Sequence, residues 1–204
     1  MKRVMGLIPS EFIRYAFEER VEGIRKLAEG TFGPEALIGF TRHNAAVITC
    51  GSAGVNGSIK GIGFIHREEH LKDTLRKLRE ELKKPYDPKR ALNFLLNEIY
   101  IRDKVDFTKL VSLELAKKHT WENLTRGNKE ATILFFTPPS TSYEVRCDVE
   151  VHESGPVWEF VNAVHDVFHR PKKPRDWSRT PAYLFKIREI YDNGERAMGV
   201  RIYP

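Results

Sequence analysis

The pattern of apolar and polar positions predicts a mainly β protein with added helices. Between residues 10 and 29 the apolar side chains recur three and four positions apart, and Gly30 follows them, which is typical of an amphipathic helix. Residues 36–40, 45–50 and 56–65 are short apolar or loosely alternating runs separated by turn-forming residues. We interpret these runs as strands.

A helical hairpin is predicted as an insert in residues 68–105. Its first half carries a stripe of leucines among charged residues, at Leu71, Leu75, Leu78 and Leu82. Pro85 ends this helix, and Pro88 opens a second one with its own apolar face. A leucine stripe is usually core, so we expect the hairpin to cap the barrel or to form part of a dimer interface. A contribution to a substrate pocket is the less favoured alternative.

The stretch from 109 to 152 predicts three further strands. Val111, Leu113 and Leu115 alternate with residues that include Glu114, which favours a strand with one buried face over a helix. The continuous apolar run from 131 to 136 indicates a central strand covered on both faces. A strictly alternating run then predicts an antiparallel strand with one wet face, buried at Tyr143, Val145, Cys147, Val149 and Val151.

A short helix is expected between the first two of these strands. Thr120 is a suitable N-cap, and Gly127-Asn128 supplies a left-handed stop. A helix of about two turns is not stable alone. Trp121 and Leu124, which share one face, are therefore expected to pin it to the sheet.

The last third of the chain predicts a helix, a loop and two strands. Gly155-Pro156 starts the helix, and residues 170–179 are a basic, proline-broken loop. Residues 182–191 predict a strand with a bulge at Arg188-Glu189. Residues 198–203 can add a final edge strand.

Composition places this pattern in one soluble domain spanning residues 1–204. The chain is 41% hydrophobic, and no apolar run reaches the ~20 residues of a membrane span. No signal peptide is visible at the start, so we expect a cytoplasmic protein whose Cys50 and Cys147 are buried free thiols. A charged fraction of 30% suits a thermophilic protein.

Lys117, Lys118, His119 and Thr120 form a candidate anion site. Two cations, an imidazole and a hydroxyl stand where the unpaired N–H groups of a helix start emerge, and such groups attract phosphate. The alternative is an exposed basic turn. A net charge of +6 and a pI near 9.3 favour anionic partners in general.

The order of elements around this motif resembles a known family. A strand, the pattern Thr-aromatic-x-Asn-Leu in a short helix, an apolar strand, an alternating strand and a helix are similar to the FMN-binding split β-barrel proteins. These are the pyridoxamine-phosphate-oxidase-like flavoproteins and their uncharacterised archaeal relatives. The resemblance covers residues 107–192 and implies a split antiparallel β-barrel of about six strands with a helical-hairpin insert.

This resemblance also implies where FMN would bind. The phosphate is expected at Lys117, Lys118, His119 and Thr120, although Lys118 and His119 replace the more usual Ser and basic residue. The flavin ring is expected against the hairpin of residues 45–65, which carries Thr49 and Ser58, although the glycines there can instead ease bulges. The resemblance also implies a homodimer, with Trp177 reaching the cofactor from the loop of residues 170–179.

No catalytic residue is predicted, and the substrate stays unnamed. No carboxylate pair, Ser/His/Asp order or activated cysteine stands out. His165 and His169 have metal-ligand spacing, with His152 or Asp166 as further ligands, but without an accompanying motif they favour solvated or hydrogen-bonded histidines. The sequence therefore favours an FMN-binding oxidoreductase. The alternative is a nucleic-acid-binding module that uses the loop of residues 170–179.

Overall fold

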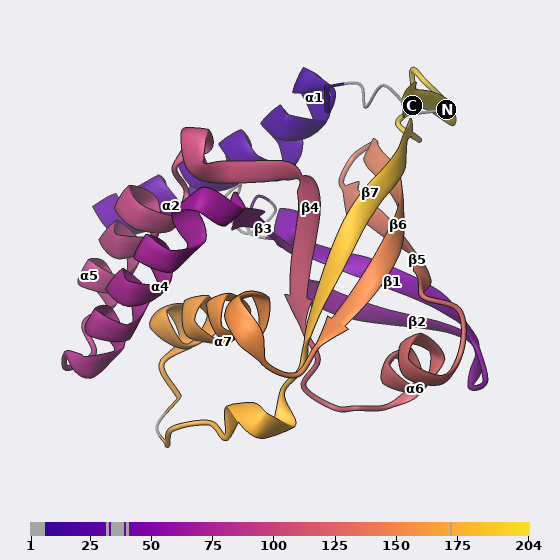
Figure 1. Cartoon of the computed structure of the whole chain (residues 1–204). Helices are drawn as coiled ribbons and strands as arrows, with labels where there is room; N and C mark the ends of the chain where they lie inside the picture. The colour runs from indigo at the N-terminus through magenta and orange to yellow at the C-terminus, as the bar shows by residue number, and fades with distance from the viewer. Residues whose placement is uncertain (1–6, 32, 34–38, 40, 172) are drawn as a thin grey trace.

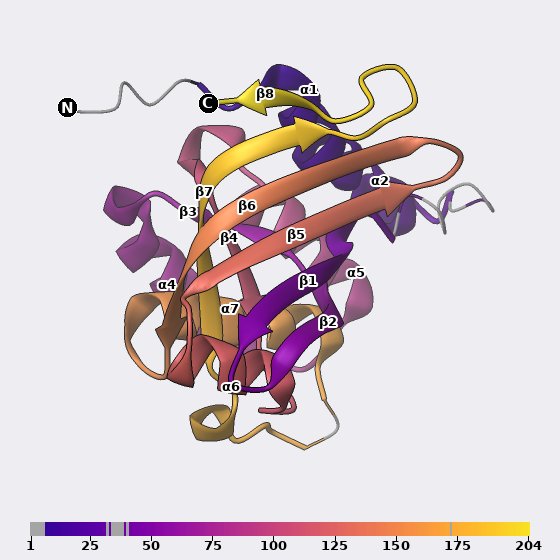
Figure 2. The same ribbon diagram turned by 90° about the vertical axis from the view of Figure 1, so that its right-hand side faces the viewer.

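The computed structural model describes residues 7–31, 33, 39, 41–171 and 173–204. Its centre is one eight-stranded antiparallel sheet in the order β2-β1-β5-β6-β7-β4-β3, with β8 paired to β7 (Figure 2). The strands are β1 Asn44–Gly51, β2 Gly54–Gly61, β3 Gly63–His66, β4 Val105–Leu113, β5 Glu130–Thr137, β6 Thr141–His152, β7 Ala182–Asp192 and β8 Val200–Tyr203.

The two ends of the sheet, β2 and β3, are consecutive in the chain and are separated only by Ile62. β2 pairs with β1 and β3 pairs with β4, while the N–H of Ile62 donates to the carbonyl of His43 at 2.7 Å. The sheet therefore curls back on itself as a split barrel. It is not closed, because no pairing joins β2 to β4 within the described ranges. It also has more strands than the about six expected.

Helices surround this barrel on different sides (Figure 1). One long N-terminal helix, with a π-helical middle, lies across one end of the barrel, and α6 lies near the other end, below β1 and β2. The helical hairpin and α7 lie together on one side. Their bounds are α1 Ser10–Ile13, η1 Arg14–Glu18, α2 Glu19–Glu29, α4 Glu68–Lys83, α5 Pro88–Phe94, η3 Leu95–Ile99, α6 His119–Arg126 and α7 Gly155–His169, with short 3₁₀ turns η2 Thr41–His43, η4 Arg102–Lys104 and η5 Trp177–Arg179.

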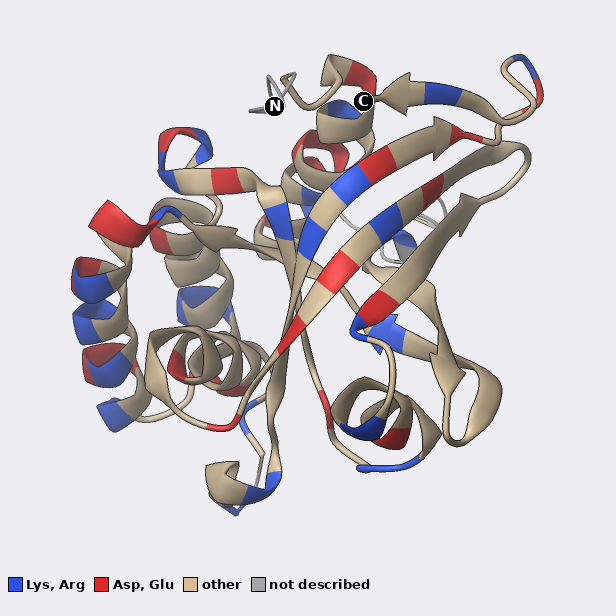
Figure 3. Ribbon diagram, turned by 45° about the vertical axis from the view of Figure 1, so that its right-hand side comes forward, with Lys and Arg blue, Asp and Glu red and all other residues tan. Residues whose placement is uncertain are grey.

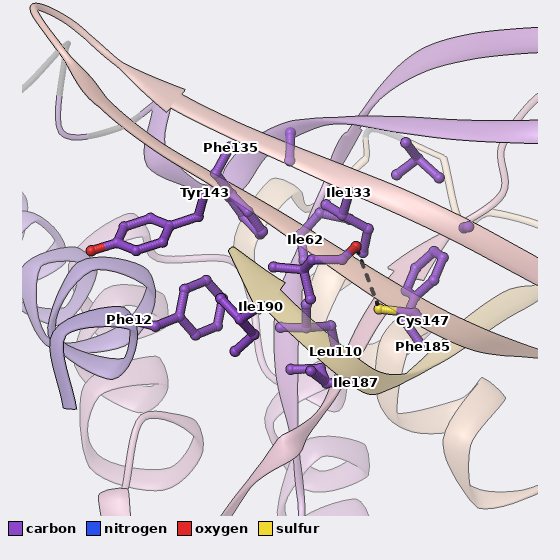
Figure 4. Packing of buried hydrophobic residues seen from close by; sticks show 14 of the residues in the cluster. Phe12, Ile62, Leu110, Ile133, Phe135, Tyr143, Cys147, Phe185, Ile187 and Ile190 are labelled. Atoms are coloured by element: carbon purple, nitrogen blue, oxygen red, sulfur yellow. Dashed lines mark hydrogen bonds between the residues drawn. The ribbon is translucent and has the colours of Figure 1, made fainter. Parts of the chain in front are cut away.

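The main core fills the barrel and is closed at one end by the N-terminal helix. Phe12 is fully buried, and its ring lies edge-on to those of Phe135 and Tyr143, with centroids 5.9 and 5.4 Å away (Figure 4). Burial raises the pKa of Tyr143 to about 12. The helix predicted from residues 10–29 is therefore a lid on the barrel core.

A second core joins the helical hairpin to the outer side of the barrel. Leu71, Leu75 and Leu78 are buried together with Phe160 and Val167 of α7. The predicted hairpin helices are present at 68–83 and from Pro88 onward. Their leucine stripe is thus covered within this chain.

Several predicted strands are confirmed in detail. The inward positions of β6 are buried from Tyr143 to Val149. The expected bulge in β7 falls at Arg188, since Arg146 pairs with Glu189 and Cys147 pairs with Ile187. The final edge strand is β8.

Other expectations about strands and thiols were wrong. β5 is not covered on both faces: its outward side chains are more exposed, and Phe136 is 57% exposed. Leu115 was expected inside and is 61% exposed, whereas Glu114 was expected on the polar face and is 2% exposed. Cys50 is exposed rather than buried.

The short helix α6 also differs at both ends. Its N-cap is Lys118, not Thr120, and Gly127 has a φ of −130°, so no left-handed stop is present there. A Cβ at Gly127 would lie 2.9 Å from the carbonyl oxygen of Asn123, which explains the glycine by close approach. Leu124 is fully buried and Trp121 packs against the core as predicted.

Two further expectations concern the apolar run 36–40 and membrane-spanning helices. The apolar run 36–40 falls almost wholly outside the described residues. Among the helices that are described, none is both long and apolar enough to cross a bilayer.

Candidate functional site

A cavity of about 600 Å³ lies where the barrel is split, between its strands and α7. One wall is the continuous run from Ser58 in β2 to Phe64 in β3, and another is the segment 111–116 at the end of β4. Leu95 and Ile99 of the helical hairpin also line it. Its size falls within the roughly 300–1,000 Å³ of small-molecule sites, and the hairpin does contribute to this pocket.

One face of α7 forms the wall opposite the strands. The lining residues recur at helical spacing, as Phe160, Val161, Val164, His165, Phe168 and His169. Val164 and Phe168 are only partly buried, because the helix faces the cavity there instead of packing on the sheet. The apolar face of α7 thus serves partly as a cavity wall.

A buried polar group lies in the strand wall. Lys60 of β2 and Glu114 form an ion pair of 2.8 Å between Nζ and Oε2, with side-chain exposures of 11% and 3%. Tyr183 of β7 donates its hydroxyl to the same oxygen at 2.8 Å. The other oxygen, Oε1, accepts the backbone N–H groups of Ala116 and Lys117, both at 2.8 Å.

These contacts set the charge state of the group. Burial raises the pKa of Glu114, but hydrogen bonds and the charge of Lys60 outweigh it, so the pKa lies below its usual range. Burial and the neighbouring carboxylate raise the pKa of Tyr183. Glu114 is therefore ionised and Tyr183 is a neutral donor at neutral pH.

His165 and His169 lie side by side on the α7 wall. Their ring centroids are 4.6 Å apart, and His165 Nδ1 lies 3.0 Å from Asp166 Oδ1. Burial, and then the charge of His165, lower the pKa of His169. No group of three or more potential metal ligands occurs in the described part of the chain.

The start of α6 lies beside the inner side of β2. The Thr120 hydroxyl is 4% exposed, accepts from Asn56 Nδ2 at 2.8 Å and lies 3.0 Å from Ser58 Oγ. Lys117 has a left-handed φ of 48°, reaches Glu153 at 3.3 Å and lies 4.7 Å from the ring centre of Trp121. Lys118 and His119 are exposed.

The predicted cofactor residues are thus partly brought together. Ser58 lines the cavity and contacts Thr120, and the segment 117–119 continues directly from the cavity wall at Ala116. Thr49 is 2% exposed and accepts a hydrogen bond from Asn123 Nδ2 at 3.2 Å, which ties the β1–β2 hairpin to α6. Trp177 does not line the cavity, and its Nε1–H donates to Asp166 at 2.8 Å.

Sequence reasoning missed Lys60, Glu114 and Tyr183. The one local signal was a charged residue inside the glycine-rich run 56–65. Only the strand pairing reveals that Lys60 and Glu114, 54 positions apart, meet.

Comparisons with known proteins give relatives by fold only. No family model matches this sequence, and no curated protein matches it. HupZ from Group A Streptococcus has a TM-score of 0.46 at 12% identity, over 75% of this chain and 86% of that chain. A putative pyridoxamine 5'-phosphate oxidase from Listeria innocua has a TM-score of 0.45 at 10% identity, over 81% and 97%.

A third solved structure covers nearly the whole chain. It is a pyridoxamine 5'-phosphate oxidase-related, FMN-binding protein from Nostoc punctiforme, with a TM-score of 0.46 at 11% identity, over 98% of this chain and 99% of that chain. At identities of 10–12%, the likeness to these three proteins is one of fold. The solved structures that this chain is similar to include pyridoxamine-phosphate-oxidase-like and FMN-binding proteins, the group that its sequence resembles.

Proposed function

We propose that this protein binds FMN and acts as a flavin-dependent oxidoreductase. The observation that carries the proposal is the position of Ser58, which lines the apolar cavity and also contacts Thr120 at the start of α6. The candidate phosphate site at the start of α6 and the apolar cavity are therefore adjacent within one chain. FMN has this combination of a phosphate and a large planar ring.

The start of α6 supports the phosphate end of the site. The first N–H groups of a helix have no partner within the helix, and an anion there gains roughly 0.3–1 kcal/mol from the helix dipole. Lys117 and Lys118 add positive charge at this position. Thr120 is already hydrogen-bonded inside the protein, so its side chain positions β2 against α6.

The β2–β3 run supports the ring end. Gly61 and Gly63 line the cavity, and a Cβ at Gly63 would meet nothing within 4 Å. Bare backbone therefore faces open space, as the close approach of a flat ring requires. A bound flavin would supply the hydride or electron chemistry, while the chain supplies orientation and exclusion of water.

Purified protein is expected to bind FMN, and Lys118→Ala is expected to weaken this binding by about 1–3 kcal/mol. Lys118 is exposed, so its loss should not disturb the fold. Absorbance and fluorescence titrations measure the affinity. Lys72→Ala, on the exposed face of α4, is the control with the same change in net charge. Equal effects of the two substitutions would contradict the phosphate site, and failure of FMN to bind at all would contradict the proposed function.

The nucleic-acid alternative gains no specific support from the described residues. Arg175 donates to Asp166 at 2.7 Å, Trp177 donates to the same carboxylate, and Arg170 donates to the carbonyls of Leu82 and Lys84. Residues of both charge signs are also interspersed along the helices and strands (Figure 3). The loop residues that were candidates for contacting nucleic acid are therefore largely held by the protein itself.

We also propose that two copies associate through the outer face of β2, β1 and β5. Exposed apolar side chains occur there, with Val55 80%, Ile59 71% and Phe136 57% exposed. The register places Ile59 and Leu134 on either side of Ala46, on one face. Such a patch on an edge strand favours association, and a second copy would cover the apolar surface next to Ser58.

Light scattering at micromolar protein concentration is expected to show a dimer, and Phe136→Glu is expected to shift it to monomer. Phe136 is exposed on this face and does not line the cavity. FMN should raise both dimer affinity and melting temperature, because a ligand stabilises the state that binds it. Lys83→Gln, at an exposed position of α4, makes the same change of −1 in net charge and is the control. A monomer that holds FMN stoichiometrically would contradict a shared site.

A further inference from the structure

The two partners of the buried ion pair in the cavity are satisfied very differently. Glu114 accepts four hydrogen bonds, from Lys60, Tyr183 and two backbone N–H groups. An ammonium has three donors, yet within the described part of the chain Lys60 donates only to Glu114 and otherwise lies over the Tyr183 ring, 5.5 Å from its centre. Two N–H donors of Lys60 are therefore left for another acceptor.

Stability alone does not explain this pair. A buried ion pair loses much of its attraction to desolvation, and an apolar pair of similar size is often equally stable. Without Lys60, Glu114 would still have three donors. The main effect of this arrangement is therefore to fix the position of the Lys60 ammonium, since the Glu114 carboxylate has enough donors without it. Both residues line the cavity.

The rest of the cavity wall is mainly apolar, with a second cation at Arg20, which uses two of its five N–H donors within the protein. Val164 and Phe168 of α7 and Ile62 contribute apolar surface. Arg20 donates to the hydroxyl of Tyr100 at 2.7 Å and to the carbonyl of Ile62 at 3.3 Å. An occupant would thus contact apolar walls and meet two cations, Lys60 and Arg20. Lys60 is the one that a buried carboxylate fixes in place.

We propose that this cavity binds a mainly apolar organic anion, and that Lys60 recognises its carboxylate or similar anionic oxygen group. Glu114 is a positioning residue that fixes the Lys60 ammonium, and Tyr183 supports Glu114 from β7. The inference deepens the proposed function by naming the class of substrate that would lie beside the flavin. It rests on that function only for the reaction, because binding is tested without flavin chemistry.

Two fluorescent probes with the same aromatic body test the inference. 1-Anilinonaphthalene-8-sulfonate carries an anionic group, and N-phenyl-1-naphthylamine lacks it. Lys60→Met should weaken binding of the sulfonate at least about tenfold, or about 1.4 kcal/mol, and leave the neutral probe unchanged. Lys72→Met on α4 removes the same charge from an exposed site and should change neither affinity.

Two further variants locate the binding and guard against misfolding. Val164→Trp narrows the cavity from the α7 wall and should reduce binding of both probes. Lys60→Met with Glu114→Gln removes one positive and one negative charge, so it leaves no unpaired buried charge and no change in net charge. This double variant should show the same selective loss for the sulfonate.

Three results would overturn the inference. These are unchanged sulfonate affinity in both folded Lys60 variants, equal loss of both probes on Lys60→Met, and unchanged binding of both probes to Val164→Trp. The FMN titration of the same samples is a separate readout. A protein that binds no FMN but shows the selective loss supports the anion site and contradicts only the flavin proposal.

Discussion

Glu114→Leu is expected to lower the free energy of unfolding by about 3–5 kcal/mol, the range for breaking a buried ion pair from one side. The substitution strands the Lys60 ammonium, the Tyr183 hydroxyl and two backbone N–H groups in a site where Glu114 is 2% exposed. Urea unfolding followed by circular dichroism measures this change. The cost is large because each stranded donor loses a partner that water reaches poorly.

Glu150→Leu is the matched control for this substitution. Glu150 of β6 also pairs with a lysine, Lys186, but the two side chains are 45% and 47% exposed, and exposed pairs contribute roughly 0–1 kcal/mol. Adding Lys60→Met to Glu114→Leu should recover part of the loss, because the unpaired charge disappears. Equal destabilisation by Glu114→Leu and Glu150→Leu would contradict the claim that burial of Glu114 causes the large loss of unfolding free energy.

The pH dependence of stability offers an independent check on Glu114. Its pKa is lowered in the folded protein, so its contribution is present above the unfolded-state pKa of about 4.3. That contribution is lost as the pH falls through the folded-state pKa. The unfolding free energy of the native protein should therefore fall in acid more steeply than that of the double variant Lys60→Met with Glu114→Leu, which lacks both charges.

Periodicity predicted the elements whose burial is set by their own pattern. The alternation in β6, the leucine stripe of α4 and the bulge at Arg188 all appear where the sequence indicates them. In each case one face is apolar over several turns or pairs. Local sequence then contains the information that tertiary packing uses.

The predictions were wrong for segments whose burial is decided by neighbouring elements of the fold. β5 is apolar from Ile133 to Phe136, but β1 and β6 flank it and no described helix covers Phe136, so one face stays exposed. Leu115 lies past the end of β4, where the chain turns and Glu114 points inward to Lys60. The predicted alternation was extended past Leu113, where β4 ends. The end of a strand is set by its pairing with the partner strand, which the alternation alone does not show.

The candidate site was only partly accessible from the sequence for a similar reason. The segment Lys117–Thr120 is recognisable because its chemistry is contiguous in the chain. Its contact with Ser58, 62 positions away, depends on the β2 register. The same holds for the cavity, because it is made by the break at Ile62 and by α7, which are not adjacent in sequence.

Asp166→Leu is expected to destabilise the protein by about 3–5 kcal/mol and to release the loop that follows α7. The Asp166 carboxylate is 6% exposed and accepts from Arg175 Nε at 2.7 Å and Trp177 Nε1 at 2.8 Å. Hydrogen bonds from these groups and His165 outweigh the effect of burial, and they lower the pKa of Asp166. Its loss therefore leaves the Nε–H of Arg175 and the indole N–H of Trp177 without an acceptor, while Arg175 still donates to Asn162 Oδ1 at 3.0 Å.

Urea unfolding and limited trypsin digestion together test this role of Asp166. The variant should be cleaved faster at Arg175 or Arg179, because nothing else in the described ranges holds the Trp177 indole N–H. Asp73→Leu is the control: its ion pairs with Arg76 and Lys77 lie on the exposed face of α4, so it should change neither readout.

Since His165 lines the cavity and contacts the Asp166 carboxylate, release of the loop should also weaken probe binding. Native-like stability and protease resistance in Asp166→Leu would show instead that the other contacts hold the loop without Asp166. These are the Trp158–Trp177 ring contact, with centroids 5.8 Å apart, and the hydrogen bonds of Arg175 and Thr180 to Asn162 Oδ1.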